Sequence, residues 1–423
     1  MPDTGWRQLL LQRIGTGIDR LAKSRPRGYL LTATIFALAG YGWLLMFPWL
    51  VLAGVAGVYD ALTGRPAIAW LQLLIWTAVA AASALVCYRT ARFRPALPAG
   101  IVLERSRVPA LFSLVGELCR HYRGPAIDRV VITGAFELEI LKTPCRALPV
   151  WSANTLVIGL PLIQSLSAVQ FRCVLARRLG QFSKRYNLLL NWLNQLRRIW
   201  PQYADATASA ARPGFQPVRW FFSVFAPLYD QVSLPAVRLD ELAADSYAME
   251  VCSGEEVLDA ITTETVCRFY LEEKYWPVYR RVSATVRQAM PKPHAGMVSV
   301  LRAGLQGERA GQWLKQAMDG EPRHDDPMPS LARRVENIGY LKTCMDGLAA
   351  VPAADVYLGA AAGKLDPAPV DVSPREISRE SECHPFKPGF RNFTALLARL
   401  SRRHYAHNDA PGGDNHLQIP SRS

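Results

Sequence analysis

Hydrophobic residues fill two long stretches near the N-terminus and then give way to shorter, mixed patterns. Residues 28–59 and residues 66–88 contain no charged side chain. Each stretch is longer than the ~20 apolar residues that a helix needs to cross a bilayer. The pattern therefore predicts two transmembrane helices, over 28–59 and 66–88, joined by a short loop.

Basic residues flank these stretches unevenly, which predicts how the helices are oriented. Six lie within residues 1–27, one (Arg65) lies in the loop, and three follow the second stretch. By the positive-inside bias, both termini and the main domain are expected in the cytoplasm, at the inner membrane if the organism is bacterial. Residues 6–24 alternate apolar and basic positions at helical spacing, so segment 1–27 is expected to hold a basic amphipathic helix on the membrane surface or a solvated one.

The pattern between residues 95 and 350 predicts one mainly helical α+β domain. Strands are expected on both sides of a turn at Gly134 (129–141) and over 154–160, which makes a small sheet. Ser167 and Gln170 form a capping box that starts a helix, expected to run to Trp200 and to end at Pro201. Further helices are expected over 108–122, 215–252 with interruptions near Pro227 and Pro235, 255–285, 298–318 and 330–348.

Composition changes again near residue 352, where Pro, Ala, Gly, Ser and charged residues become frequent. We expect 352–423 to be largely disordered, with 352–390 mostly linker and 408–423 without fixed structure. Residues 389–404 are predicted to form one basic amphipathic helix.

Net charge and cysteine content indicate which binding partners and which kinds of site to expect. The 49 basic and 35 acidic residues give a net charge of +14, but no nucleic-acid-binding motif accompanies it. Membrane lipid is therefore the expected partner for this charge, and nucleic acid is not. The eight cysteines contain no C-x-x-C pair, which argues against a zinc ribbon or a dithiol redox site. No nucleotide-binding fingerprint or serine-nucleophile motif is present.

The stretch 174–187, VLARRLGQFSKRYN, has the form of a zinc-binding helix without its ligands. In the H-E-x-x-H motif, two histidines on one helix face bind zinc and the glutamate activates the metal-bound water. Here Arg177, Arg178 and Gln181 stand at those three positions. Arginine cannot coordinate a metal and Arg178 cannot act as a base, so no catalytic residue is assigned.

Three further segments follow in matching order. Glu241 lies four residues before Asp245 in the predicted helix LDELAADSYAMEV. A strand, a turn and a capped helix start precede the motif in NTLVIGLPLIQSLSAVQFRCVL. A later segment, DPMPSLARRVENIG, is similar to D-x-H-P-S-L-x-x-R, with Met328 at the position of the histidine. Together with the two membrane helices, residues 28–345 resemble the membrane-bound gluzincin zinc peptidases of the HtpX and CAAX-prenyl-protease type. The resemblance implies a gluzincin-like fold in which Glu241 marks the third zinc-ligand position and Asp245 the residue that supports a ligand.

The resemblance also indicates what replaces the metal. A buried glutamate without zinc would be an unpaired charge, so Arg177 is expected to pair with Glu241 as a structural substitute, although two acids left on a helix surface is the simpler reading. We therefore predict a membrane-anchored pseudopeptidase without a cofactor. It would bind an unknown protein or peptide partner in the former substrate groove. The alternative is an active zinc endopeptidase of membrane-protein quality control with non-standard ligands, for which zinc would be the cofactor.

Overall fold

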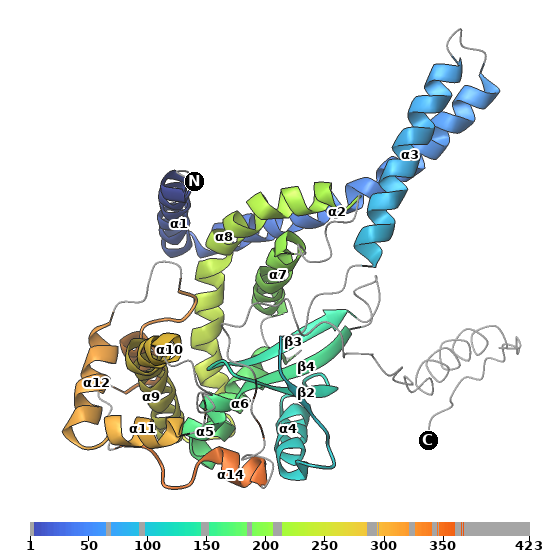
Figure 1. The fold of residues 1–423 in the computed structure, drawn as a ribbon. Coiled ribbons are helices and arrows are strands. Elements are labelled where there is room, and N and C mark those ends of the chain that lie inside the picture. The colour runs from blue at the N-terminus through green and yellow to red at the C-terminus, as the bar shows by residue number, and fades with distance from the viewer. Residues whose placement is uncertain are drawn as a thin grey trace, which may run out of the picture. The chain divides into compact units, whose positions relative to one another are not determined.

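The computed structural model describes residues 4–64, 69–92, 98–144, 152–183, 188–205, 214–285, 294, 296–320, 326–340, 345, 347–359, 365 and 367 (Figure 1). The chain divides into a unit of Met1–Ser373 and a unit of Pro374–Ser423. The second unit, with the helix predicted over 389–404 and the segment 408–423, lies outside the described residues, as does most of 352–390.

The described part is mostly helical with one small mixed sheet, which agrees with the predicted α+β class. The helices before the sheet are α1 (Thr4–Ser24), α2 (Pro26–Thr63) and α3 (Ala69–Ala91), and α4 (Pro109–His121) follows the first strand. The helices after the sheet are α5 (Leu160–Ser165), α6 (Ala168–Gln181), α7 (Leu188–Asp205), α8 (Gln216–Ala248), α9 (Gly254–Tyr270), α10 (Trp276–Thr285), α11 (Met297–Gly304), α12 (Glu308–Asp319), α13 (Leu331–Ile338) and α14 (Ala353–Tyr357), with a π-helical turn at Leu271–Tyr275 between α9 and α10.

The sheet has the strand order β1-β2-β4-β3. Its strands are β1 (Ile101–Leu103), β2 (Arg129–Thr133), β3 (Leu138–Pro144) and β4 (Ser152–Gly159). β2 and β4 pair in parallel, with Ile132 opposite Ile158, whereas β1 and β3 pair antiparallel to their neighbours. The sequence predicted the three later strands but missed β1, which has only three residues. Because β3 is the last strand in the order, it forms one edge of the sheet, and its first residues border the candidate site.

Two hydrophobic clusters support different parts of the chain. The larger one joins the sheet, α4, α6 and α9, with Leu156, Ile158, Phe171 and Leu175 fully buried. The second joins α2 to α7 and α8 through Trp200, Phe222 and their neighbours. Helices α2 and α3 are both long and apolar enough to cross a membrane, in agreement with the predicted spans 28–59 and 66–88.

Helix α8 is continuous across Pro227 and Pro235, where the sequence predicted interruptions, and instead it bends (Figure 1). The Tyr29 hydroxyl of α2 lies between backbone groups of α8. It donates to Val232 O at 3.0 Å and accepts from Ala236 N at 2.8 Å. In a regular helix these two groups would bond to each other, so the inserted hydroxyl keeps both satisfied while the helix bends.

Replacing Tyr29 with phenylalanine is expected to destabilise the protein. The ring would still fill its buried site, but two buried backbone groups would lose their partner, at a cost of about 1–3 kcal/mol. The measurement is thermal unfolding of the detergent-solubilised full chain. Tyr59→Phe is the matched control, because Tyr59 lies on the same helix and is 66% exposed. Equal melting temperatures for both variants would show that the Tyr29 hydroxyl does not support the bend.

Other predicted helix limits need correction. The helix that starts at Ser167 ends at Gln181 rather than near Trp200, and Pro201 lies inside α7 without stopping it. The segment 298–318 forms two helices separated at Gly307, whose φ of 54° is left-handed. The segment 330–348 is helical only to Ile338, because Gly339 at φ 91° ends α13. The packed domain also extends beyond residue 350, where the sequence predicted its end, since Ala353 and Ala354 of α14 are buried.

Candidate functional site: an ion-pair cluster beneath a cleft

Helix α6 presents the degenerate motif on its last turns. The predicted capping box is present: Ser167 Oγ accepts from Gln170 N, and Gln170 Oε1 accepts from Ser167 N. Gly180 lets α6 approach α8 closely, since a Cβ there would lie 2.6 Å from the Tyr247 Cβ. This close contact brings Arg177, Arg178 and Gln181 against the acidic face of α8.

The Arg177 guanidinium joins the two acids retained in the E-x-x-x-D pattern. Its Nη2 lies 2.5 Å from Glu241 Oε2, and its Nε lies 2.6 Å from Asp245 Oδ1. All three side chains are almost fully excluded from solvent, at 1%, 5% and 0% exposure. The structure thus brings together the pair that the sequence proposed and adds Asp245 to it. A planar fork suits two carboxylates one helical turn apart.

Arg178 also faces α8. Its Nη1 lies 2.5 Å from Glu241 Oε1 and 3.0 Å from Gln181 Oε1. Gln181 completes its bonding with the Asp240 backbone and carboxylate through Nε2, at 3.3 and 3.4 Å. Each oxygen of Glu241 therefore accepts from a different arginine.

Arg334 of α13 is the participant that sequence reasoning missed. Its Nε lies 3.1 Å from Asp245 Oδ2 and its Nη2 lies 2.9 Å from Oδ1. The side chain is 1% exposed. Arg334 stands at the arginine that ends the D-x-H-P-S-L-x-x-R segment, which was the available signal, but that position was given no role. Met328, at the histidine position of the same segment, lies at the rim of the adjoining cleft.

The arginines keep both acids ionised despite burial. Burial raises the pKa of Glu241, but Arg178 and Arg177 outweigh it and hold the pKa below its usual value. Burial likewise raises the pKa of Asp245, and Arg334 and Arg177 reverse the shift, so this pKa is lowered. Because folding lowers these pKa values, the stability that they contribute is present at neutral pH and is lost as the pH falls below about 4.

Asp240, next to Glu241, behaves in the opposite way. Burial, reinforced by the negative charge of Glu241, raises its pKa to about 7. The folded protein therefore holds a proton on Asp240 between about pH 4 and pH 7 that the unfolded chain has released. Stability falls with rising pH across this window, because there the folded state binds more protons.

We expect Asp240→Asn to remove this pH dependence. The difference in unfolding free energy, variant minus parent, should rise from pH 4.5 to pH 8 by on the order of a few kcal/mol. Denaturant unfolding of both proteins over that range measures it. Asp128→Asn serves as the control, because the Asp128 carboxylate also accepts a hydrogen bond, from Asn154 N, but at an exposed contact. A difference that does not change with pH would mean that Asp240 titrates normally in the folded protein.

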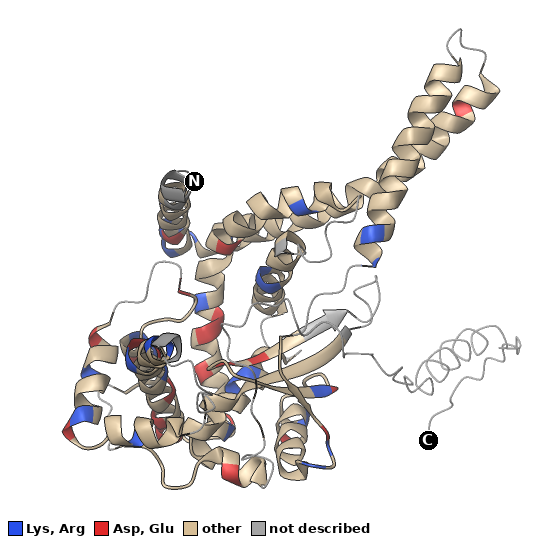
Figure 2. Cartoon of the chain, in the orientation of Figure 1, with Lys and Arg blue, Asp and Glu red and all other residues tan. Residues whose placement is uncertain are grey.

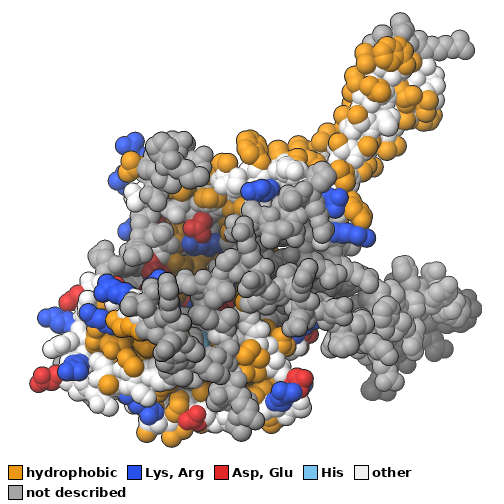
Figure 3. Space-filling view, viewed as in Figure 1, with side chains coloured by type: hydrophobic (Ala, Val, Ile, Leu, Met, Phe, Trp, Pro, Cys, Tyr) orange, Lys and Arg blue, Asp and Glu red, His pale blue; other side chains and the backbone are white. Residues whose placement is uncertain are grey.

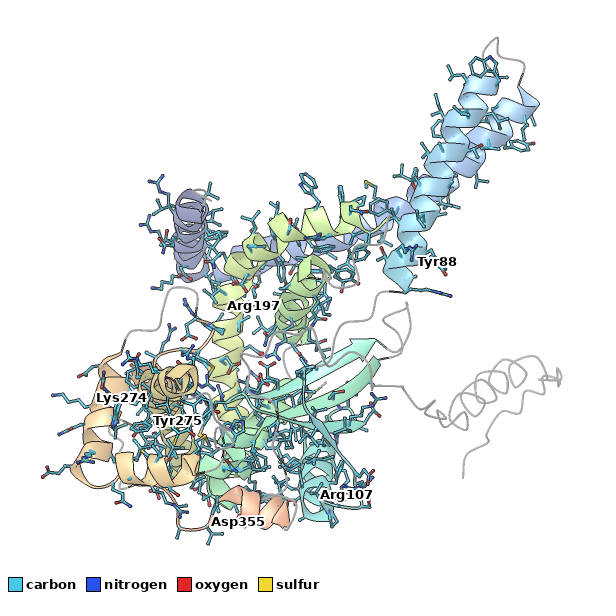
Figure 4. The ribbon with its side chains drawn as sticks, viewed as in Figure 1. Tyr88, Arg107, Arg197, Lys274, Tyr275 and Asp355 are labelled. Carbon is cyan, nitrogen blue, oxygen red and sulfur yellow. The ribbon has the colours of Figure 1, made fainter. Side chains whose placement is uncertain are left out.

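A cleft of about 300 Å³ opens beside this cluster. Arg178 and Glu241 form part of its floor, and the beginning of β3 forms one wall. Arg197 of α7, which pairs with Asp230 of α8 at 2.5 Å, also lines the cleft (labelled in Figure 4). Acidic and basic residues meet where α8 passes α6 and α7 (Figure 2). The complete lining is Phe136, Glu137, Leu138, Glu139, Arg178, Asn194, Arg197, Arg198, Asp230, Val237, Glu241, Arg268, Pro327 and Met328.

The residues present do not fit the zinc ion that the gluzincin resemblance would imply. Guanidinium groups contact Glu241, where the resemblance implies the third ligand, and Asp245, where it implies a supporting residue, and the three places where it implies histidine carry Arg177, Gln181 and Met328. Arginine offers no lone pair to a metal, and its charge repels a cation. Across the described ranges, no group of three or more His, Cys, Asp or Glu side chains is arranged to hold a metal.

Comparison with protein families, with curated proteins and with solved structures found no significant match.

Proposed function

We propose that this protein is a membrane-attached, degenerate relative of the gluzincin peptidases that binds an extended protein segment in its cleft without hydrolysing it. The observation that carries the proposal is the ring of Arg177, Arg178 and Arg334 around Glu241 and Asp245. These five side chains form a buried network at the position where the resemblance would place a metal, and the cleft beside them remains open. Peptide hydrolysis needs an activated water, and in this network guanidinium groups stand where the resemblance would place a metal ligand, at Arg177, and the base, at Arg178.

The edge of β3 supports a peptide as the occupant. Glu137 O accepts from Gly159 N at 2.7 Å, so residues 137, 139 and 141 turn their backbone groups toward β4. The N–H and C=O groups of Leu138 and Ile140 then point away from β4. No further strand pairs with this edge in the part of the chain that the structure describes. An extended segment can pair with such an edge through main-chain hydrogen bonds.

The charges in the cleft favour binding of a mixed polypeptide over a strongly charged ligand. Its lining has four arginines and four acids, and several of them pair with each other across the cleft. Arg197 binds Asp230, Arg198 of α7 binds Glu139 of β3, and Arg178 binds Glu241. These pairs hold α7 and α8 beside β3. The cleft is therefore rigid and nearly neutral.

Attachment to a membrane is the second part of the proposal. The α2–α3 hairpin is almost free of charge (Figure 2), and both of its helices are long and apolar enough to cross a membrane. Most of the apolar stretch of each helix is exposed rather than buried in the domain, as expected if lipid covers it. The positive-inside bias places the cleft on the cytoplasmic side, so cytoplasmic segments of proteins at the membrane are the proposed partners.

Binding of fluorescently labelled casein, an unfolded polypeptide, tests the proposal. The full chain in detergent should bind casein saturably in fluorescence polarisation, and the casein should remain intact on a gel. Met328→Trp should weaken binding several-fold, because Met328 lines the cleft and the larger ring would take up part of its volume. Val300→Trp makes the same replacement at an exposed position of α11 and should leave binding unchanged.

Two results would contradict the proposal. Casein cleavage that a chelator abolishes would show that the site is a working zinc peptidase. Equal casein affinity for Met328→Trp and Val300→Trp would show that the cleft is not where the polypeptide binds.

A further inference from the structure

Helix α2 is too long to lie in a bilayer as one straight span. It has 38 residues and therefore a length of about 57 Å. The hydrocarbon core is about 30 Å thick, and a tilt of about 40°, at the upper end of what membrane helices show, still leaves about 44 Å to accommodate. Part of α2 must therefore lie outside the core or along its surface.

The two parts of α2 have different neighbours. A Cβ on Gly40 would lie 3.0 Å from the Trp200 ring and 3.1 Å from Phe225, so the first part packs on α7 and α8. In the second part, Gly54 meets Ala80 and Gly57 meets Trp76, so this part packs on α3 (Figure 1). The helix contains Pro48 between them. Residues 48–63 measure about 24 Å, somewhat less than the ~30 Å thickness of the core.

The first part of α2 is apolar on the face that its protein neighbours leave uncovered. Tyr29, Ala33 and Ala37 are buried against the domain. The opposite face carries Leu31, Ile35, Leu38 and Leu45, which follow one another at helical spacing and are each more than half exposed. No charged residue occurs between 28 and 59. A helix that lies on a domain in water has a polar outer face, and this one does not.

Helix α8 extends the same surface. Trp220 and Val224 lie one turn apart, are 70% and 55% exposed, and project from the part of α8 that packs on α2. Figure 3 shows hydrophobic side chains along this edge and on into the α2–α3 hairpin. Exposed basic residues border it: Arg25 and Arg27 at the start of α2, and Arg219 on α8. At the base of the hairpin, Arg92 lies over the Tyr88 ring at 4.6 Å (Figure 4).

We propose that residues 28–47 of α2 and 216–229 of α8 form an interfacial platform that rests on an anionic phospholipid bilayer. The inference rests on the proposed attachment through the α2–α3 hairpin. The platform is continuous with that hairpin because α2 belongs to both. Its exposed tryptophan and its basic border suit the headgroup region, where an aromatic ring and cationic side chains are favoured. The platform fixes the domain, and with it the cleft, at the membrane surface.

Site-specific photocrosslinking in reconstituted full-length protein tests the platform. The protein is placed in vesicles of phosphatidylcholine and phosphatidylglycerol that contain radiolabelled phosphatidylcholine. Benzoylphenylalanine replaces one exposed apolar residue at a time: Ile35 and Val224 of the platform, Leu74 of the hairpin, and Val102 of β1 as the control outside the membrane. Lipid adducts at Ile35 and Val224 should approach the yield at Leu74 and exceed that at Val102 several-fold.

Each other outcome overturns a distinct claim. Lipid adducts at Leu74 without adducts at Val224 would mean that the hairpin enters the bilayer and the platform does not touch it. A crosslink from Val224 to a second copy of the chain would make this face a protein interface instead. Absence of lipid adducts at Leu74 as well would remove the membrane attachment on which the platform depends.

Discussion

Arg177→Ala is expected to destabilise the protein by about 3–5 kcal/mol, the range for breaking a buried ion pair by removing one partner. The variant would leave Glu241 and Asp245 buried without the guanidinium that joins them. Arg178 and Arg334 still contact one acid each, so the loss comes from the oxygens that Arg177 alone satisfies. Denaturant unfolding of the full chain in detergent measures the effect.

A double-mutant cycle separates this interaction from general disruption of the core. Arg177→Ala combined with Glu241→Ala should cost clearly less than the two single losses added, because the second change removes the Glu241 oxygen that the first has left without its donor. Arg177→Lys should remain clearly less stable than the parent protein, since an ammonium group lacks the planar fork with which the guanidinium binds two carboxylates. Strict additivity would show that Arg177 and Glu241 do not stabilise each other, and the network could not be regarded as a substitute for a metal.

Asp245→Ala is expected to be at least as damaging, in the range of about 3–5 kcal/mol or beyond. Asp245 accepts three hydrogen bonds from two arginines, so its loss takes from Arg334 the carboxylate that it binds and leaves Arg177 with Glu241 alone. Adding Arg334→Leu should recover part of the loss, because one of those cations is then replaced by an apolar side chain. The same unfolding assay applies.

The control for this prediction is an ion pair at the surface. Glu104 pairs with Arg107 at 3.1 Å, but both side chains are mostly exposed. Glu104→Ala should therefore change stability by only about 0–1 kcal/mol. If Asp245→Ala were as mild as Glu104→Ala, the buried network would not stabilise the domain.

The core of the site was predictable because it is encoded locally. The motif spacing placed Arg177 and Gln181 on one helix face, and Glu241 and Asp245 on another. Charge complementarity then suggested the pairing between the helices. Arg334 was not predictable in the same way. It lies 89 residues from its partner, and the choice between Arg333 and Arg334 depends on how α13 packs.

The fold shows a similar division. Long charge-free runs and the Ser167 capping box predicted α2, α3 and the start of α6 directly. The course of α8 could not be predicted from its own residues, because Pro235 favours a break and Tyr29, 207 positions away from Ala236, supplies the hydrogen bonds that allow the helix to continue. The end of α6 likewise depends on a distant partner, since Ser183 Oγ donates to Tyr122 O at 2.5 Å just after its last turn.

We propose that an arginine network occupies the place that a zinc ion has in a gluzincin peptidase, and the zinc content of the purified full-length protein distinguishes the two arrangements. The protein is incubated with zinc, desalted and measured by mass spectrometry before and after chelation. We predict far less than one zinc per chain, no change in melting temperature on chelation, and no cleavage of casein. One zinc per chain that a chelator removes, together with a loss of casein cleavage, would contradict the account.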